Sequence, residues 1–164
     1  MITRRAATQL AIYSIALYAV STGASGQNGL NKTLLPFPAD LALAARLANA
    51  AGQPLVLMVS LPGCPWCELL RRNYLGPMRG EGVAAYEFMV NERSRTLQNF
   101  QAQRIMPAAL SSDLKITITP TLLFLGRDGQ EIASRIEGVA SADFIGALLN
   151  ERLSIARERL QALR

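Results

Sequence analysis

The sequence predicts an α/β fold in which a mixed central sheet is flanked by helices and the chain closes on a long C-terminal helix. In the first half of the chain, apolar runs of strand length alternate with segments of helical periodicity. Two further strand-like segments follow, separated by a glycine-containing turn, and these predict an antiparallel hairpin. The chain has 164 residues, half of them hydrophobic, which suffices for one domain with its own core. We place this domain at residues 39–164.

The residues before the domain have the composition of a signal peptide. Arg4 and Arg5 form a basic head, and residues 10–20 are mostly apolar and are followed by small residues. This apolar stretch is shorter than the roughly 20 residues that span a bilayer. We therefore expect export with cleavage after Ala24, a signal peptide at 1–24 and a linker at 25–38. An uncleaved membrane anchor is the alternative.

The first half of the domain has recognisable helix and strand boundaries. Asp40 can cap a helix that stops at Gly52-Gln53-Pro54. The unbroken apolar run at 55–59 is bounded by prolines and predicts a central strand covered on both faces. Cys64 then opens a second helix, which we expect to end near Gly76-Pro77.

The next segments complete one side of the expected sheet. Residues 83–90 predict a second strand, residues 93–104 a further helix, and residues 108–115 a short helical turn.

The last segments are a hairpin and a helix. Strands are expected at 121–125 and 131–136, on either side of the turn Gly126-Arg127-Asp128-Gly129. From Ser141 onward, a long helix is expected to run nearly to Arg164.

The composition excludes several kinds of chemistry. The chain has no histidine, which excludes a Ser-His-Asp or Cys-His catalytic unit within it. Two cysteines alone cannot complete a four-ligand zinc site, so we expect no metal and no cofactor apart from a redox-active disulfide. The net charge of +5 comes from scattered arginines without interleaved aromatic residues, so no nucleic-acid partner is expected. The chemistry must then come from sulfur, carboxylates or the backbone, and sulfur is the obvious candidate.

The two cysteines stand at a predicted strand-to-helix junction. At the helix N-terminus, unpaired N–H groups and the helix dipole would stabilise a Cys64 thiolate, so Cys64 is the predicted nucleophile. Pro65 supports this arrangement because the first helical turn needs no donor at that position. Cys67 is close enough to close a small disulfide ring and to resolve a mixed disulfide. A structural disulfide is the alternative, but so small a loop would add little stability.

Four motifs occur in an order typical of one superfamily, and the chain resembles the thioredoxin-like proteins over residues 41–149. The motifs are Cys64-Pro65-Trp66-Cys67 after an apolar strand, Ile118-Thr119-Pro120-Thr121 before the hairpin, Phe124-Leu125-Gly126-Arg127-Asp128-Gly129 at its turn, and Glu137-Gly138-Val139 before the last helix. The resemblance implies a thioredoxin fold. It is greatest to exported thioredoxin-related reductants.

The resemblance also implies a substrate-binding surface around the cysteines. It implies a cis Thr119-Pro120 bond beside Cys64, which would expose the Thr119 backbone to a substrate strand. The alternative is a proline that merely starts a strand. Trp66 could offer a flat apolar contact to a substrate protein, or it could pack on its own domain.

One position departs from the family pattern. Thioredoxins proper carry a buried acid where this chain has Met58. Glu68 and Glu87 are possible substitutes, although Glu68 is expected to be a solvated helix residue whose charge would oppose the Cys64 thiolate. The route by which Cys67 loses its proton therefore stays open.

These observations together predict thiol–disulfide exchange with protein thiols and disulfides in the periplasm. Strong oxidants of the superfamily often have a histidine where this chain has Trp66, so we favour a reductant. A reductant in an oxidising compartment would need electrons from a membrane partner. A dithiol oxidant and a non-catalytic binding or assembly factor are the alternatives.

The last helix carries a narrow apolar seam. It consists of Leu149, Leu153, Ala156, Leu160 and Leu163. The seam is too short for a coiled-coil prediction, so we favour packing within the domain and a soluble monomer over a dimer contact.

Overall fold

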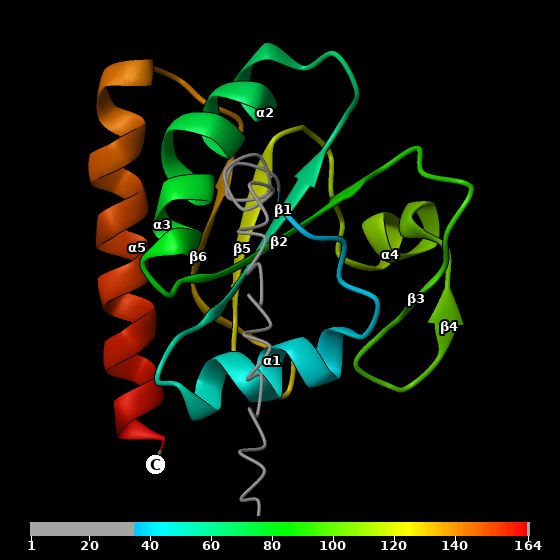
Figure 1. Cartoon of the computed structure of the whole chain (residues 1–164), viewed down its shortest axis with the longest axis horizontal. Coiled ribbons are helices and arrows are strands. Elements are labelled where there is room, and N and C mark those ends of the chain that lie inside the picture. Colours follow the sequence, from blue (N-terminus) through cyan, green and yellow to red (C-terminus); the bar gives the residue numbers. More distant parts are fainter. Residues whose placement is uncertain (1–34, 164) are drawn as a thin grey trace, which may run out of the picture.

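The computed structural model describes residues 35–163 (Figure 1). The predicted signal peptide and most of the predicted linker lie outside these residues. Within 35–163, no helix combines the length and apolar character that a membrane crossing requires.

A mixed sheet of four strands forms the centre of the fold. The strands are β1 (Leu55–Ser60), β2 (Ala84–Met89), β5 (Thr121–Leu125) and β6 (Glu131–Glu137), in the order β2-β1-β5-β6. β1 pairs parallel with β2 and antiparallel with β5, and every residue of β1 is buried. The predicted central strand and the mixed sheet are confirmed.

Helices cover both faces of this sheet. They are α1 (Leu41–Ala50), α2 (Pro65–Leu70), the π-helical segment η2 (Arg71–Leu75), α3 (Gly76–Gly80), α4 (Pro107–Asp113) and α5 (Ala142–Ala162). Because successive side chains of a strand point to opposite faces, Val56 and Met58 share a core with α2 and α5, whereas Leu55 and Leu57 share one with α1 and α4. Figure 1 shows α5 running beside α2 and α3. The predicted fold class is thus confirmed.

The register of β1 and β5 determines which loops meet. Val59 lies opposite Thr121 at one end of the pair, and Leu55 lies opposite Leu125 at the other. The segments that follow β1 and precede β5 therefore share one end of the sheet. The turn after β5 lies at the opposite end.

Polar side chains cap two of the helices as expected. Asp40 Oδ1 accepts a hydrogen bond from the Leu43 N–H at 2.8 Å, and Ser141 Oγ accepts one from the Asp143 N–H at 3.2 Å. Each bond satisfies a donor that the first helical turn leaves open.

The helix after Cys64 does not end near Gly76-Pro77 as predicted. It passes through η2 and continues as α3 to Gly80. The Gly76 N–H bonds to the Arg71 carbonyl five residues back, which widens the turn before the proline. Pro77 then falls at the start of α3, where its missing donor is tolerated.

The helix predicted at 93–104 is wrong, because this segment forms a small hairpin of β3 (Leu97–Gln98) and β4 (Arg104–Ile105). Asn99 Oδ1 accepts hydrogen bonds from the N–H groups of Gln101 and Gln103 at 3.0 and 2.9 Å. Such side-chain bonds compete with helical ones.

The apolar seam of α5 packs within the domain. Its first four members, Leu149 to Leu160 in the order given above, are buried against the sheet, whereas Leu163 is 75% exposed. The prediction that the seam packs within the domain is therefore confirmed for these four residues.

Candidate active site

Cys64 and Cys67 form a disulfide at the start of α2. Cys64 occupies the N-cap in an extended conformation, and its Sγ accepts the Cys67 N–H at 3.2 Å. Pro65 is the first helical residue, as predicted. The helix start thus directs a backbone donor at the sulfur of Cys64, which favours a negative charge there.

The two sulfurs differ in their access to solvent. Cys64 is half-buried, whereas Cys67 has no exposed surface. An incoming sulfur can therefore approach Cys64 and not Cys67. This asymmetry is the one that a nucleophile and a resolving cysteine require.

A short loop sets the position of Cys64. β1 ends at Ser60, and the Cys64 N–H returns to the Leu61 carbonyl at 3.3 Å. Gly63 has a φ of +73°, a conformation that favours glycine. This turn joins a fully buried strand directly to the helix that carries both cysteines.

The segment before β5 lies at the same end of the sheet. The Thr119–Pro120 peptide bond is cis, the isomer that the family resemblance implied. The Pro120 carbonyl accepts the Gly138 N–H at 2.8 Å, and the Ile118 carbonyl accepts the Thr121 hydroxyl at 2.7 Å. Within the described residues, no hydrogen bond uses the backbone N–H or C=O of Thr119.

Large apolar side chains are exposed next to these segments. Leu61 and Trp66 are each 40% exposed, and Ile118 is 49% exposed. Trp66 therefore packs partly on its own domain and still presents apolar surface to solvent. We call these three residues the apolar rim. All three belong to segments at the same end of the sheet as Cys64, where their exposed surface is available for contact with another protein.

A polar cluster joins the cysteine helix to the sheet, and it consists of the buried Ser60, Arg71 and Glu87 and the half-exposed Glu68. Arg71 binds Glu87 through two hydrogen bonds, Nε to Oε2 at 2.7 Å and Nη2 to Oε1 at 2.5 Å. Ser60 Oγ donates to Glu87 Oε1 at 2.5 Å, and Arg71 Nη1 lies 2.5 Å from Glu68 Oε1. Sequence reasoning missed Ser60 and Arg71. The spacing of three residues between Glu68 and Arg71 on one helix was the available signal.

The polar cluster contains both acids, Glu68 and Glu87, that could substitute for the missing acid at Met58. Met58 is fully buried and apolar, and it pairs in register with Glu87 on the neighbouring strand. Both carboxylate oxygens of Glu87 are engaged by Arg71 and Ser60. The acidic side chain nearest to the usual position is therefore held in an ion pair.

Glu68 is half-exposed and is paired with two arginines. Its pKa is lowered, chiefly by the hydrogen bond from Arg71, while Arg72 lies 3.2 Å away on the solvent side. The pKa of Arg71 is raised above its ordinary value, chiefly by its hydrogen bonds to Glu87. The negative charge of Glu68, expected to oppose the Cys64 thiolate, is thus offset by neighbouring positive charges.

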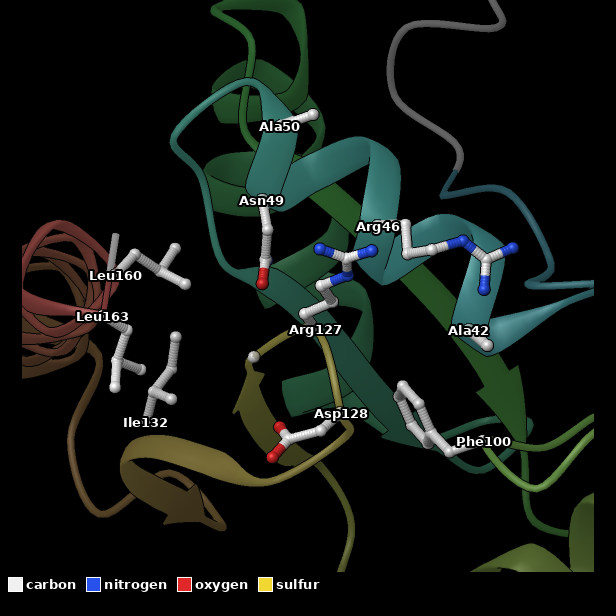
Figure 2. Close-up of a pocket in the computed structure, with 11 residues that line it drawn as sticks. Ala42, Arg46, Asn49, Ala50, Phe100, Arg127, Asp128, Ile132, Leu160 and Leu163 are labelled. Carbon is white, nitrogen blue, oxygen red and sulfur yellow. The ribbon is translucent and has the colours of Figure 1, made fainter.

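A hollow of about 1030 Å³ lies elsewhere on the molecule (Figure 2). Ile132, Leu160 and Leu163 line one side of it, and Phe100 lies on the other. Its lining includes the turn after β5, which places it at the opposite end of the sheet from Cys64. None of the predicted site residues lines it.

Comparison with known proteins shows which family shares this fold. A family model described as thioredoxin-like domain matches residues 41–152. The DsbH oxidoreductase shares 16% identity over 76% of this chain and 86% of its own, with a TM-score of 0.51. Mitochondrial thioredoxin 3 from Saccharomyces cerevisiae shares 18% identity over 75% of this chain and 96% of its own, with a TM-score of 0.49.

A periplasmic protein has lower structural similarity. The thioredoxin SoxS from Paracoccus pantotrophus shares 19% identity over 62% of this chain and 96% of its own, with a TM-score of 0.38. No curated protein sequence matches the chain. At these identities the likeness is one of fold.

Proposed function

The chain belongs to the thioredoxin-like domain family, and on that premise we propose that it is an exported oxidoreductase that exchanges disulfides with protein substrates. The observation that carries the proposal is the disulfide between a half-buried Cys64 at a helix start and a fully buried Cys67. An inert structural disulfide would not need one sulfur accessible and capped by a backbone donor.

The reaction proceeds through a mixed disulfide. In the reducing direction, the Cys64 thiolate attacks a substrate disulfide, bonds to one substrate sulfur and releases the other as a thiolate. The Cys67 thiolate then attacks Cys64, forms the Cys64–Cys67 bond and releases the second substrate sulfur. The enzyme dithiol is oxidised by two electrons, and the substrate disulfide is reduced to two thiols after protonation by solvent.

The surroundings of Cys64 favour a protein over a small molecule as substrate. The apolar rim supplies exposed surface beside the sulfur, and the Thr119 backbone is open to β-type pairing with an extended segment. A disulfide in a flexible, partly apolar stretch of a protein fits both features. Thr119, Pro120 and Trp66 are accordingly the proposed substrate-binding residues.

We favour the reducing direction. Trp66 cannot form the charged hydrogen bonds with which a histidine at that position would stabilise the reduced form of an oxidant. In an oxidising compartment, the oxidised enzyme would need to be reduced again by a membrane electron donor. Protein thiols, protein disulfides and such a donor are therefore the proposed partners.

Insulin reduction and a redox titration of the full chain test the activity. We expect turnover with dithiothreitol as donor and a reduction potential of about −270 to −180 mV. A reduction potential of about −120 mV would instead indicate an oxidant. Absence of turnover, with Cys64 unreactive toward iodoacetamide at neutral pH, would contradict the proposal and favour a binding or assembly factor.

Export has its own test. The proposal expects the chain to be recovered from the periplasmic fraction with residue 25 as its first residue. Recovery of the uncut chain in the membrane fraction would support the anchor instead, and recovery in the cytoplasm would contradict export.

A further inference from the structure

Arg71 lies one helical turn after Cys67 on the same buried face of the helix. Both residues are buried, and the Arg71 N–H donates to the Cys67 carbonyl. Side chains four residues apart on a helix are neighbours, with about 5–6 Å between their Cβ atoms. Long helical side chains also point back toward the N-terminus. The Arg71 side chain therefore extends toward the turn that contains Cys67.

Glu87 and Ser60 hold the Arg71 guanidinium in place. The two bonds from Arg71 to Glu87 form a bidentate pair, and Ser60 ties that carboxylate to the end of β1. Arg71 and Glu87 are 6% and 7% exposed, so the pair is largely removed from solvent. Solvent therefore screens the positive charge of Arg71 less than it screens the charge of a surface arginine.

Stability alone does not account for this pair. Removing two charges from water is costly, and well-packed apolar residues of similar volume often stabilise a fold at least as well. The cluster therefore invites an explanation from the chemistry beside it.

Cys67 must be a thiolate in order to resolve the mixed disulfide. Its full burial disfavours the thiolate that the resolving step requires. The charged groups paired with one another on this helix and on β2 are Glu68, Arg71, Arg72 and Glu87.

Among the neighbouring elements, α5 runs beside α2 and α3 and carries the exposed Asp143 in its first turn. β1 contributes Met58 and Ser60, and the segment before β5 contributes Ile118, Thr119 and Pro120, all uncharged. Tyr74, two turns beyond Cys67, donates its hydroxyl to the Ala142 carbonyl.

We propose that Arg71, anchored by Glu87 and Ser60, is a positioning residue that favours the thiolate of Cys67 in the resolving step. The thiolate attacks the Cys64 sulfur of the mixed disulfide, the Cys64–Cys67 bond forms, and the bond from Cys64 to the substrate breaks. The substrate sulfur leaves with the electron pair and takes a proton from solvent. This inference rests on the proposed exchange function of the cysteine pair.

The test titrates Cys67 directly, without turnover. In the full chain carrying Cys64→Ala, Cys67 is the single thiol, and thiolate absorbance near 240 nm is followed against pH. Arg71→Met is expected to raise the Cys67 midpoint by about one unit or more, and Glu87→Gln to lower it by about one unit, because the two changes alter the local charge in opposite directions.

Matched variants separate charge from structure. Arg72→Met removes the same charge from the next residue, which is 73% exposed, and is expected to shift the midpoint by less than about half a unit because solvent screens it. Arg71→Lys keeps the charge and is expected to stay nearer the parent than Arg71→Met.

Equal or same-direction shifts in Arg71→Met and Glu87→Gln would overturn the proposal, because a structural role alone predicts no opposition of sign. If Arg71→Met does not fold, an unmoved midpoint in Glu87→Gln overturns it. Insulin reduction by the two-cysteine chain is measured separately, so a failure of the proposed function is distinguished from a failure of this inference.

Discussion

The two ends of the β1–β5 pair present different kinds of surface. The carboxyl end of β1 carries the half-buried Cys64 and the exposed residues of the apolar rim. At the amino end, a six-residue strand or about 20 Å away, lies the hollow of about 1030 Å³. This hollow is thus separate from the cysteine pair.

This difference shows that a surface pocket is a poor indicator of the binding site when the substrate is another protein. A pocket is the usual first candidate for a site that binds a small molecule. An enzyme that exchanges disulfides with proteins instead needs an accessible sulfur, an exposed apolar contact and backbone groups that are free to pair. The following variants test the contrast between the two ends, in order of decreasing expected effect.

Cys64→Ala is expected to reduce insulin reduction to the rate of dithiothreitol alone. Without this sulfur no mixed disulfide forms, and the buried Cys67 cannot replace it. The measurement is insulin turbidity, with circular dichroism as the control for folding. Residual turnover above background in a folded variant would contradict the assignment of the nucleophile.

Leu149→Ala is expected to cost about 2–5 kcal/mol of unfolding free energy, because the side chain is fully buried against the sheet. Leu163→Ala, at the hollow and 75% exposed, is expected to cost less than about 0.5 kcal/mol. Urea denaturation compares them. Similar losses in both variants would mean that the end of α5 is also part of the core.

Trp66→Ser and Ile118→Ser are each expected to raise KM for insulin about tenfold, equivalent to about 1.4 kcal/mol of lost apolar contact. The rate of reaction with a small aromatic disulfide should change little, because such a molecule is too small to contact the whole apolar rim. Leu163→Ser is the matched control at the other end. An equal effect on the small disulfide would show that the rim acts on the sulfur and not on substrate binding.

Arg46→Ala and Arg127→Ala, at the hollow, are expected to leave insulin reduction within about twofold of the parent. Both side chains are exposed and lie far from Cys64 along the sheet. Steady-state kinetics check this. A large loss would mean that the substrate extends over both ends.

The parts of the fold that local sequence determines were predictable. The apolar run at 55–59, the cap at Asp40 and the glycine turn after β5 each follow from neighbouring residues, and all are present. The position of Cys64 at a helix start follows in the same way.

The secondary-structure predictions failed where contacts between distant segments or a change in helix type determine the structure. The segment at 93–104 has helical periodicity, but Gln98 donates its N–H to the Ala39 carbonyl and Asn99 folds the chain back on itself. The helix was expected to stop at Pro77, and a shift to π-type bonding before it allows continuation. The Arg71–Glu87 pair joins a helix to a strand and leaves little trace in the sequence.

The most direct test of the central claim is trapping with Cys67→Ala in cells that express the full chain. We predict covalent adducts with exported proteins that are joined through Cys64 and released by reductant. The double variant Cys64→Ala, Cys67→Ala should form no adducts. Absence of adducts from a folded, exported Cys67→Ala chain, or adducts that survive reductant, would contradict the central claim.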